Sequence, residues 1–119
     1  MLSQTNTAYT LFEYNDGKNE TYVKLTFDDG GSYYDAAVAA LIPHREHGFF
    51  QTGIAVGFEM TGTVDEVKHK IGKILRDEVM PKFSGDPTTQ DRIRQDIAQI
   101  MLGKNSVSQV KATSIVNSL

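Results

Sequence analysis

Two histidines and a glutamate fall within four residues, in the segment His44-Arg45-Glu46-His47. Imidazole and carboxylate groups bind transition metals, and imidazole transfers protons near neutral pH. The helical zinc motifs separate their two histidines by four residues, whereas the separation here is three. A proline precedes the segment and a glycine follows it, which indicates a loop. We therefore expect a solvated loop, and we keep as an alternative a small metal-dependent enzyme that uses His44, Glu46, His47 and Asp28.

A second acidic motif follows a stretch of alternating polar and apolar residues. Leu25-Thr26-Phe27-Asp28-Asp29-Gly30 resembles the Thr-Phe-Asp-Asp-Gly signature of polysaccharide deacetylases. The resemblance implies a general base at Asp28 and a metal ligand at Asp29. It covers six residues of 119, and His44-x-x-His47 stands where that family has His-x-x-x-His. Two acidic residues before two glycines are also typical of a turn that leads into a helix, and a turn is what we expect.

Several kinds of catalytic site have no support in the sequence. The chain has no cysteine, which excludes a thiol enzyme, a zinc ribbon and a disulfide scaffold. It contains no Gly-x-Ser-x-Gly motif and no phosphate-binding Gly-rich loop followed by Lys and Ser or Thr. We therefore expect a protein that is not an enzyme and that uses neither a metal nor another cofactor.

The acidic residues are concentrated in the first half of the chain. The whole chain has 15 acidic and 12 basic residues, a net charge of −3. Residues 1–60 contain eight acidic and three basic side chains, a net charge of −5, whereas residues 61–119 contain seven acidic and nine basic ones, a net charge of +2. Nucleic-acid recognition depends on clustered Lys and Arg, so we expect no nucleic-acid partner. The acidic half suits a basic protein partner instead.

Tyrosines lie among these carboxylates in the N-terminal third. Tyr buries a large area at low entropic cost and carboxylates pair with Lys or Arg, so the mixture favours a surface that binds a cationic protein. The same charges are also typical of solvated turns and strand edges. If a partner binds here, we expect it to contact Glu13, Asp16, Glu20, Asp28, Asp29, Tyr33, Tyr34 and Asp35.

The first half of the chain has the patterns of strands around one helix. Residues 8–14 and 21–27 predict a β-hairpin, with Asp16-Gly17 in the turn. Residues 33–42 predict an alanine-rich helix that Ser32 caps and Pro43 ends. Residues 49–60 alternate so regularly that we expect one long strand, with a bulky face and a small face that contains Gly53 and Gly57. Glycines inside a strand indicate that another group lies close over them.

The second half predicts two helices and an ambiguous tail. Thr63 and Glu66 form a capping box before an amphipathic helix over residues 64–80, which Pro81 ends. Asp86 and Pro87 predict the start of a third helix that runs to Gly103. Residues 104–119 fit a flexible tail, a short helix capped by Ser106 or an extra strand.

These elements predict an α+β fold. We expect a single domain over residues 1–119, with an antiparallel sheet of three or more strands, about three helices packed on it, and the order β-β-α-β-α-α. The longest apolar run is far shorter than the ~20 residues that span a bilayer, and the N-terminus lacks the pattern of a signal peptide. A cytoplasmic protein without a membrane partner is therefore expected.

A small acidic α+β domain without a catalytic signature fits a protein that acts by occlusion. We expect an immunity protein or inhibitor, of the kind bacteria use, that neutralises a basic toxin or nuclease domain. A homodimeric adaptor that resembles a secretion chaperone is a further alternative, and the sequence leaves the oligomeric state open.

Overall fold

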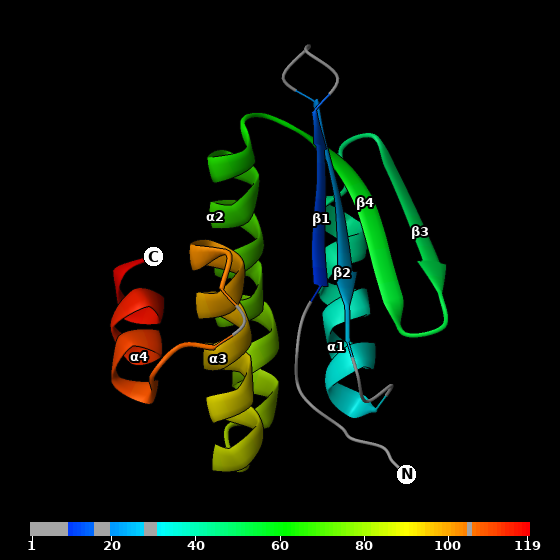
Figure 1. Ribbon diagram of the computed structural model, residues 1–119. Coiled ribbons are helices and arrows are strands. Elements are labelled where there is room, and N and C mark those ends of the chain that lie inside the picture. Colours follow the sequence, from blue (N-terminus) through cyan, green and yellow to red (C-terminus); the bar gives the residue numbers. More distant parts are fainter. Residues whose placement is uncertain (1–9, 16–19, 28–30, 105) are drawn as a thin grey trace, which may run out of the picture.

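The computed structural model describes residues 10–15, 20–27, 31–104 and 106–119, and it describes residues 10–15 by their backbone alone. These residues form a four-stranded antiparallel sheet and four α-helices (Figure 1). In chain order the elements are β1 (Thr10–Asn15), β2 (Glu20–Thr26), α1 (Ser32–Leu41), β3 (Gly48–Thr52), β4 (Ala55–Thr61), α2 (Val64–Ile74), α3 (Pro87–Leu102) and α4 (Gln109–Ser118). None of the described helices is long and apolar enough to cross a membrane.

Two hairpins lie side by side in the sheet, in the strand order β1-β2-β4-β3. The predicted hairpin of β1 and β2 is confirmed, and β2 also pairs with β4. The β2–β4 register aligns Val23 with Phe58 and Leu25 with Val56, and all four side chains are fully buried or nearly so. The alternation of buried and half-buried residues along β2 places one face of the sheet in the core.

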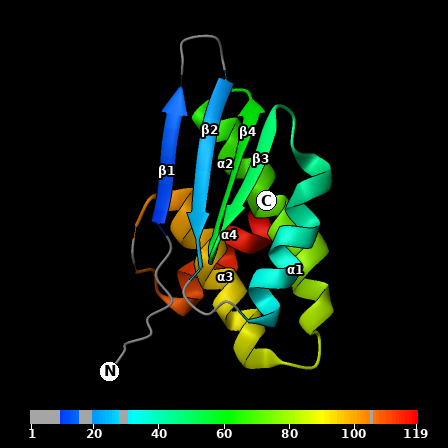
Figure 2. The same cartoon turned by 90° about the vertical axis from the view of Figure 1, so that its right-hand side faces the viewer.

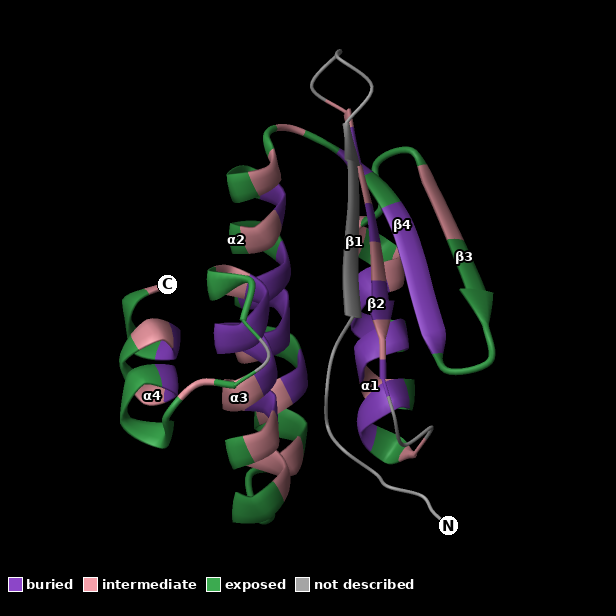
Figure 3. Cartoon of the chain, viewed as in Figure 1, coloured by how far each residue is buried: buried purple, intermediate pink, exposed green. Residues whose placement is uncertain are grey.

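The described helices lie on this face of the sheet and at its β3 edge. In Figure 2 the sheet is seen from its other face, with α2, α3 and α4 behind it and α1 beside the β3 edge. The surfaces that the sheet and the helices turn toward each other are buried (Figure 3). The largest fully buried side chains come from both layers: Phe58, Leu25, Leu41, Met60, Ile71, Leu75, Ile93, Ile97, Ile100, Val23, Val56 and Val67.

The single strand expected over residues 49–60 is instead the hairpin of β3 and β4. Gly53 adopts a φ of 57°, a left-handed conformation that costs glycine nothing. Gly53 and Ile54 therefore form a two-residue turn between the paired residues Thr52 and Ala55. The turn also changes the phase of the alternation, so that Phe50 pairs with Gly57 rather than sharing a face with Phe58.

The capping predictions hold for α2 and α3 but not for α1. Thr63 and Glu66 form the expected capping box at α2. Asp86 accepts a hydrogen bond from the Thr89 amide at the start of α3, and that helix ends at Gly103 in the left-handed conformation. The prediction of a Ser32 cap was wrong, because Gly31 is the N-cap of α1 and makes no side-chain hydrogen bond.

The second helix continues further than its proline suggested. After Ile74 the chain makes a π-helical turn over Leu75–Val79 and a 3-10 turn over Met80–Phe83, so Pro81 lies inside the helical segment. Proline is tolerated there because it stands near the start of a new turn, where its missing N–H is not needed.

The α+β class is confirmed, but the predicted order lacked one strand and one helix. The observed order is β-β-α-β-β-α-α-α. The ambiguous segment 104–119 contains α4, which Ser108 rather than Ser106 caps by accepting a hydrogen bond from the Lys111 amide.

The turn at Gly53 can be tested by substitution. Gly53→Ala should lower the free energy of unfolding by about 1–2 kcal/mol, because a Cβ disfavours positive φ. Nothing lies within 4 Å of a Cβ built at Gly53 or at Gly85, and only Gly53 of these two has a positive φ. Gly85→Ala is therefore the matched control and should be neutral or slightly stabilising. Equal effects of the two substitutions in urea denaturation would contradict the turn.

Candidate functional site

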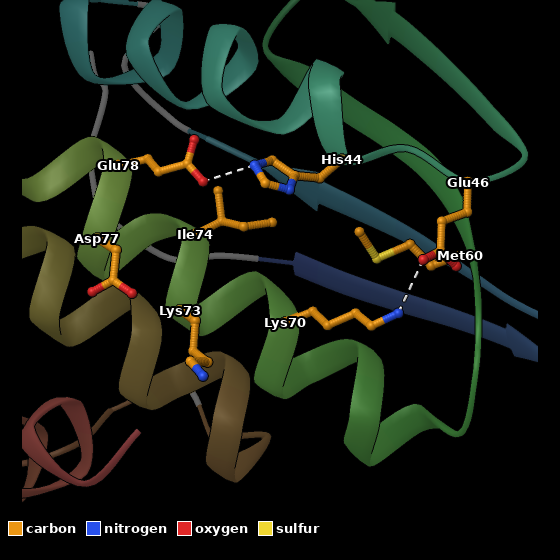
Figure 4. Close-up of a pocket in the computed structure, with 8 residues that line it drawn as sticks. All are labelled: His44, Glu46, Met60, Lys70, Lys73, Ile74, Asp77 and Glu78. Atoms are coloured by element: carbon orange, nitrogen blue, oxygen red, sulfur yellow. Dashed lines mark hydrogen bonds and ion pairs between the residues drawn. The ribbon is translucent and has the colours of Figure 1, made fainter.

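A cleft of about 350 Å³ lies between the loop that follows α1, the end of β4 and α2. Figure 4 shows two polar pairs, one at each end of it, with Ile74 and Met60 between them. Eight residues line the cleft: His44, Glu46, Met60, Lys70, Lys73, Ile74, Asp77 and Glu78.

The three predicted ligands of the loop contact neighbouring elements and do not converge on one point. His44 Nε2 lies 2.7 Å from Glu78 Oε2, in the π-helical turn. Glu46 accepts hydrogen bonds from the Thr61 amide at 2.9 Å and from Lys70 Nζ at 3.1 Å. His47 Nε2 lies 2.6 Å from Thr61 Oγ1. The loop is thereby connected to β4 and to the long helix.

These contacts give no support to the metal-dependent alternative. Among the residues that the structure describes, no group of three His, Asp or Glu side chains could hold a metal ion. Asp28 lies outside the described residues. Glu78 orients the His44 imidazole, but none of the eight lining residues carries a hydroxyl or thiol that could act as a nucleophile. We therefore propose no reaction for the cleft.

A second region, the face of the sheet turned away from the helices, has the features of a binding surface. No described helix covers this open face (Figure 1). Its positions on β2 are the half-buried ones that alternate with the core residues, and its positions on β4 are the residues paired with these. On β2 these positions are Glu20, Tyr22, Lys24 and Thr26, and their partners on β4 are Thr61, Glu59, Gly57 and Ala55.

Two aromatic rings stack on the open face. The Phe50 ring lies directly over Gly57, so a Cβ at position 57 would overlap it. The ring reaches across β4 toward Tyr22, and the two ring centroids are 5.5 Å apart with planes inclined by 12°. Phe50 remains 36% exposed. The group expected close over the small face of this segment is thus a side chain of the same hairpin.

Carboxylates flank the aromatic pair. Glu59 is paired in register with Tyr22, and its Oε2 lies on the open face above Gly48 of β3. Burial raises the pKa of the Tyr22 hydroxyl above its ordinary value of 10.0, and the charge of Glu59 raises it further. Glu20 lies on the same face of β2, with Oε2 3.8 Å from His47 Nε2.

The predicted partner-binding residues are dispersed. Glu20 lies on the open face, and Glu13 is known only from its backbone in β1, opposite Val23. Asp35 is exposed on α1, beside the β3 edge of the sheet. Asp16, Asp28 and Asp29 lie outside the described residues.

Tyr33 and Tyr34 are 3% and 4% exposed, so neither ring is available as a surface anchor. Both pack edge-on against Phe27, and the Tyr34 hydroxyl donates a hydrogen bond to the Gly53 carbonyl at 2.7 Å. Tyr34 thereby connects α1 to the β3–β4 turn, and Tyr33 also packs edge-on against Phe83. Tyrosine followed by tyrosine at the start of a helix gave no indication of which element would cover the rings.

The sequence did not single out Phe50 or Glu59, and it noted Tyr22 only as one of several tyrosines. The signal that pointed toward them was Gly57, since a glycine inside a strand indicates close approach of another group. Gly57 alone did not indicate which group lies over it, because the alternating pattern gave no sign of the turn at Gly53.

Comparisons with protein-family models, with curated proteins and with solved structures find no match for this chain. The geometry of the open face is therefore the basis for assigning a function.

The cleft makes a prediction about pH. The Thr61 amide and then Lys70 lower the pKa of Glu46 below 4.5, so this carboxylate stabilises the fold above that pH and the effect disappears as pH falls through the lowered value. Because the group is well exposed, Glu46→Gln should cost less than about 1 kcal/mol at pH 7, and the cost should diminish as the pH is lowered below 4.5, measured by urea unfolding. Glu59→Gln, which loses no hydrogen bond to the described residues, is the control. A loss for Glu46→Gln that is independent of pH would contradict the assignment.

The electrostatic contact on the open face makes another prediction. Glu59→Gln should lower the pKa of Tyr22, because it removes the negative charge that disfavours the tyrosinate. The ¹³Cζ chemical shift of Tyr22 reports this titration directly. Glu20→Gln on the same strand is the control and should leave the titration unchanged, because burial and the Glu59 charge are the causes of the raised Tyr22 pKa. Equal shifts in the two variants would show that Glu59 is not the neighbouring charge.

Proposed function

We propose that this protein is a small binding domain that acts by occlusion, as an immunity protein or inhibitor that neutralises a basic toxin or nuclease domain. The observation that carries the proposal is the open face of the sheet. It presents the stacked Tyr22–Phe50 pair with Glu59 beside it, and no described helix packs on it.

The arrangement of this face is that of a protein interface. Binding energy in such interfaces concentrates in a few aromatic and charged residues near the centre, surrounded by polar residues that exclude water. Tyr22 and Phe50 supply the aromatic centre on the two sides of β4. Thr26, Thr61 and Thr52 provide polar positions around them.

The charge of the face favours a basic partner. Glu20 and Glu59 are the carboxylates of β2 and β4 on this side, and the half of the chain that forms the sheet has a net charge of −5. Complementary charge steers two proteins together and disfavours partners of the same sign. An acidic surface therefore supports a Lys- and Arg-rich partner, such as a nuclease domain whose own substrate is anionic.

A charge-reversal experiment tests this function. The purified protein is used to isolate a partner from the source cell, the partner is identified, and affinity is then measured with the two purified components. The double variant Glu20→Lys, Glu59→Lys should lose about hundredfold in affinity, because like charges then face each other. The partner should also be basic, and it should lose its own activity when it is bound at equal stoichiometry.

The matched control is Asp65→Lys, Asp91→Lys, which changes the net charge equally at exposed positions of α2 and α3. This control should bind within about threefold of the unchanged protein, since rim or distant charges contribute little. Equal losses of affinity in both double variants would show that the open face is not part of the interface. A dimer of this chain that persists on dilution and recovers no other protein would instead support the homodimeric adaptor.

A further inference from the structure

The stacked pair on the open face provides an aromatic surface that is held in place by the backbone. The Phe50 ring fits over Gly57 because glycine has no side chain there. The neighbouring Tyr22 ring is nearly parallel to it, at 12°, and the two ring centroids are 5.5 Å apart. Such rings have a negative face that attracts cations, and the attraction grows when the site loses water.

A carboxylate lies beside this surface. Glu59 pairs with Tyr22 across the β2–β4 ladder, and its side chain lies above Gly48, the residue to which it is also paired on β3. It is an exposed residue whose backbone carbonyl accepts hydrogen bonds from the Glu46 and His47 amides, but among the described residues its carboxylate accepts no hydrogen bond and forms no ion pair. Its acceptor oxygens are therefore available for a donor from outside the chain.

An aromatic face next to an available carboxylate matches one side chain better than any other. The guanidinium of arginine is planar, so it can stack on a ring and at the same time donate two parallel hydrogen bonds to a carboxylate. The lysine ammonium is a strongly hydrated point charge that lacks this fork. Lys24, the described basic residue of this face, already makes an interaction of its own within the chain.

We infer that Tyr22, Phe50 and Glu59 form a binding site for an arginine side chain of a protein partner. The arginine stacks on the aromatic pair and donates to the Glu59 carboxylate. The inference rests on the proposed function, because it specifies which group of the basic partner the open face recognises.

The test uses two blocked tripeptides, N-acetyl-Gly-Arg-Gly-amide and N-acetyl-Gly-Lys-Gly-amide, titrated into the isotopically labelled full chain. The arginine peptide should shift the ring resonances of Phe50 and Tyr22 and the carboxyl resonance of Glu59. It should bind about fivefold more tightly than the lysine peptide, because only arginine stacks and donates its fork together. Equal affinity for the two peptides, or shifts confined to other acidic residues, would overturn the inference.

Two variants separate the aromatic and the charged contributions. Phe50→Leu keeps an apolar side chain over Gly57 but removes the ring, and Glu59→Gln removes the charge. Each should reduce the preference for arginine to about twofold or less. Ile54→Ala is the control, since Ile54 is 38% exposed on the same hairpin and should leave the preference unchanged. Backbone spectra show whether Phe50→Leu folds, and Glu59→Gln keeps the inference testable if it does not.

The two proposals can fail separately. If the peptide preference is found and the charge-reversal variant binds the purified partner normally, the arginine site stands and the proposed function fails. If the partner is lost on charge reversal but the peptides bind equally, the proposed function stands and the arginine site is overturned.

Discussion

The pairing of β2 with β4 fixes which side chains of this protein meet the helices. Val23 opposite Phe58 and Leu25 opposite Val56 form the centre of the buried face. Side chains alternate along a strand, so a slip of one residue would turn this whole set to solvent. The helices pack on the face that this register makes apolar, and the other face of the sheet is left open by the same register.

The helical layer is arranged around that face. Val67 and Ile71 of α2 and Ile93 and Ile97 of α3 are fully buried. Close approach between the helices is possible because Gly72 of α2 lies against α3 and the end of the chain, where a Cβ would come within 3.1–3.5 Å of its neighbours. The described helices thus make a core on one side of the sheet, and the acidic half of the chain forms the open face, on which no described helix packs.

The turn at Gly53 determines which side chains of β3 lie on the open face. Gly53 permits a two-residue connection, and the residues before it therefore point to the face opposite to the one that strict alternation assigns. Phe50 is brought over Gly57 and beside Tyr22 in this way. A ring that strict alternation placed on the bulky face, together with Phe58, becomes part of a surface with carboxylates around it. The proposals for a basic partner and for arginine depend on this change.

The sequence by itself determined the features whose interactions lie within a few residues. The hairpin of β1 and β2, the Thr63 capping box and the limits of α3 at Asp86 and Gly103 follow from neighbouring side chains and backbone groups, and all were predicted. The α+β class followed from the order of such elements. The division of residues 49–60 into two strands and the presence of α4 did not. Of the expected partner-binding residues, Glu20 lies on the open face.

The tertiary structure decided which side chains remain available, because availability depends on contacts far apart in the sequence. The buried Tyr34 donates its hydroxyl hydrogen bond to the Gly53 carbonyl, 19 residues away, and the Glu46 carboxylate accepts a hydrogen bond from Lys70, 24 residues away. Local patterns contain no information about such partners, since the same residues suit a solvated loop or an exposed anchor equally well. The stacked pair and its carboxylate exist only after β2, β3 and β4 are assembled in register.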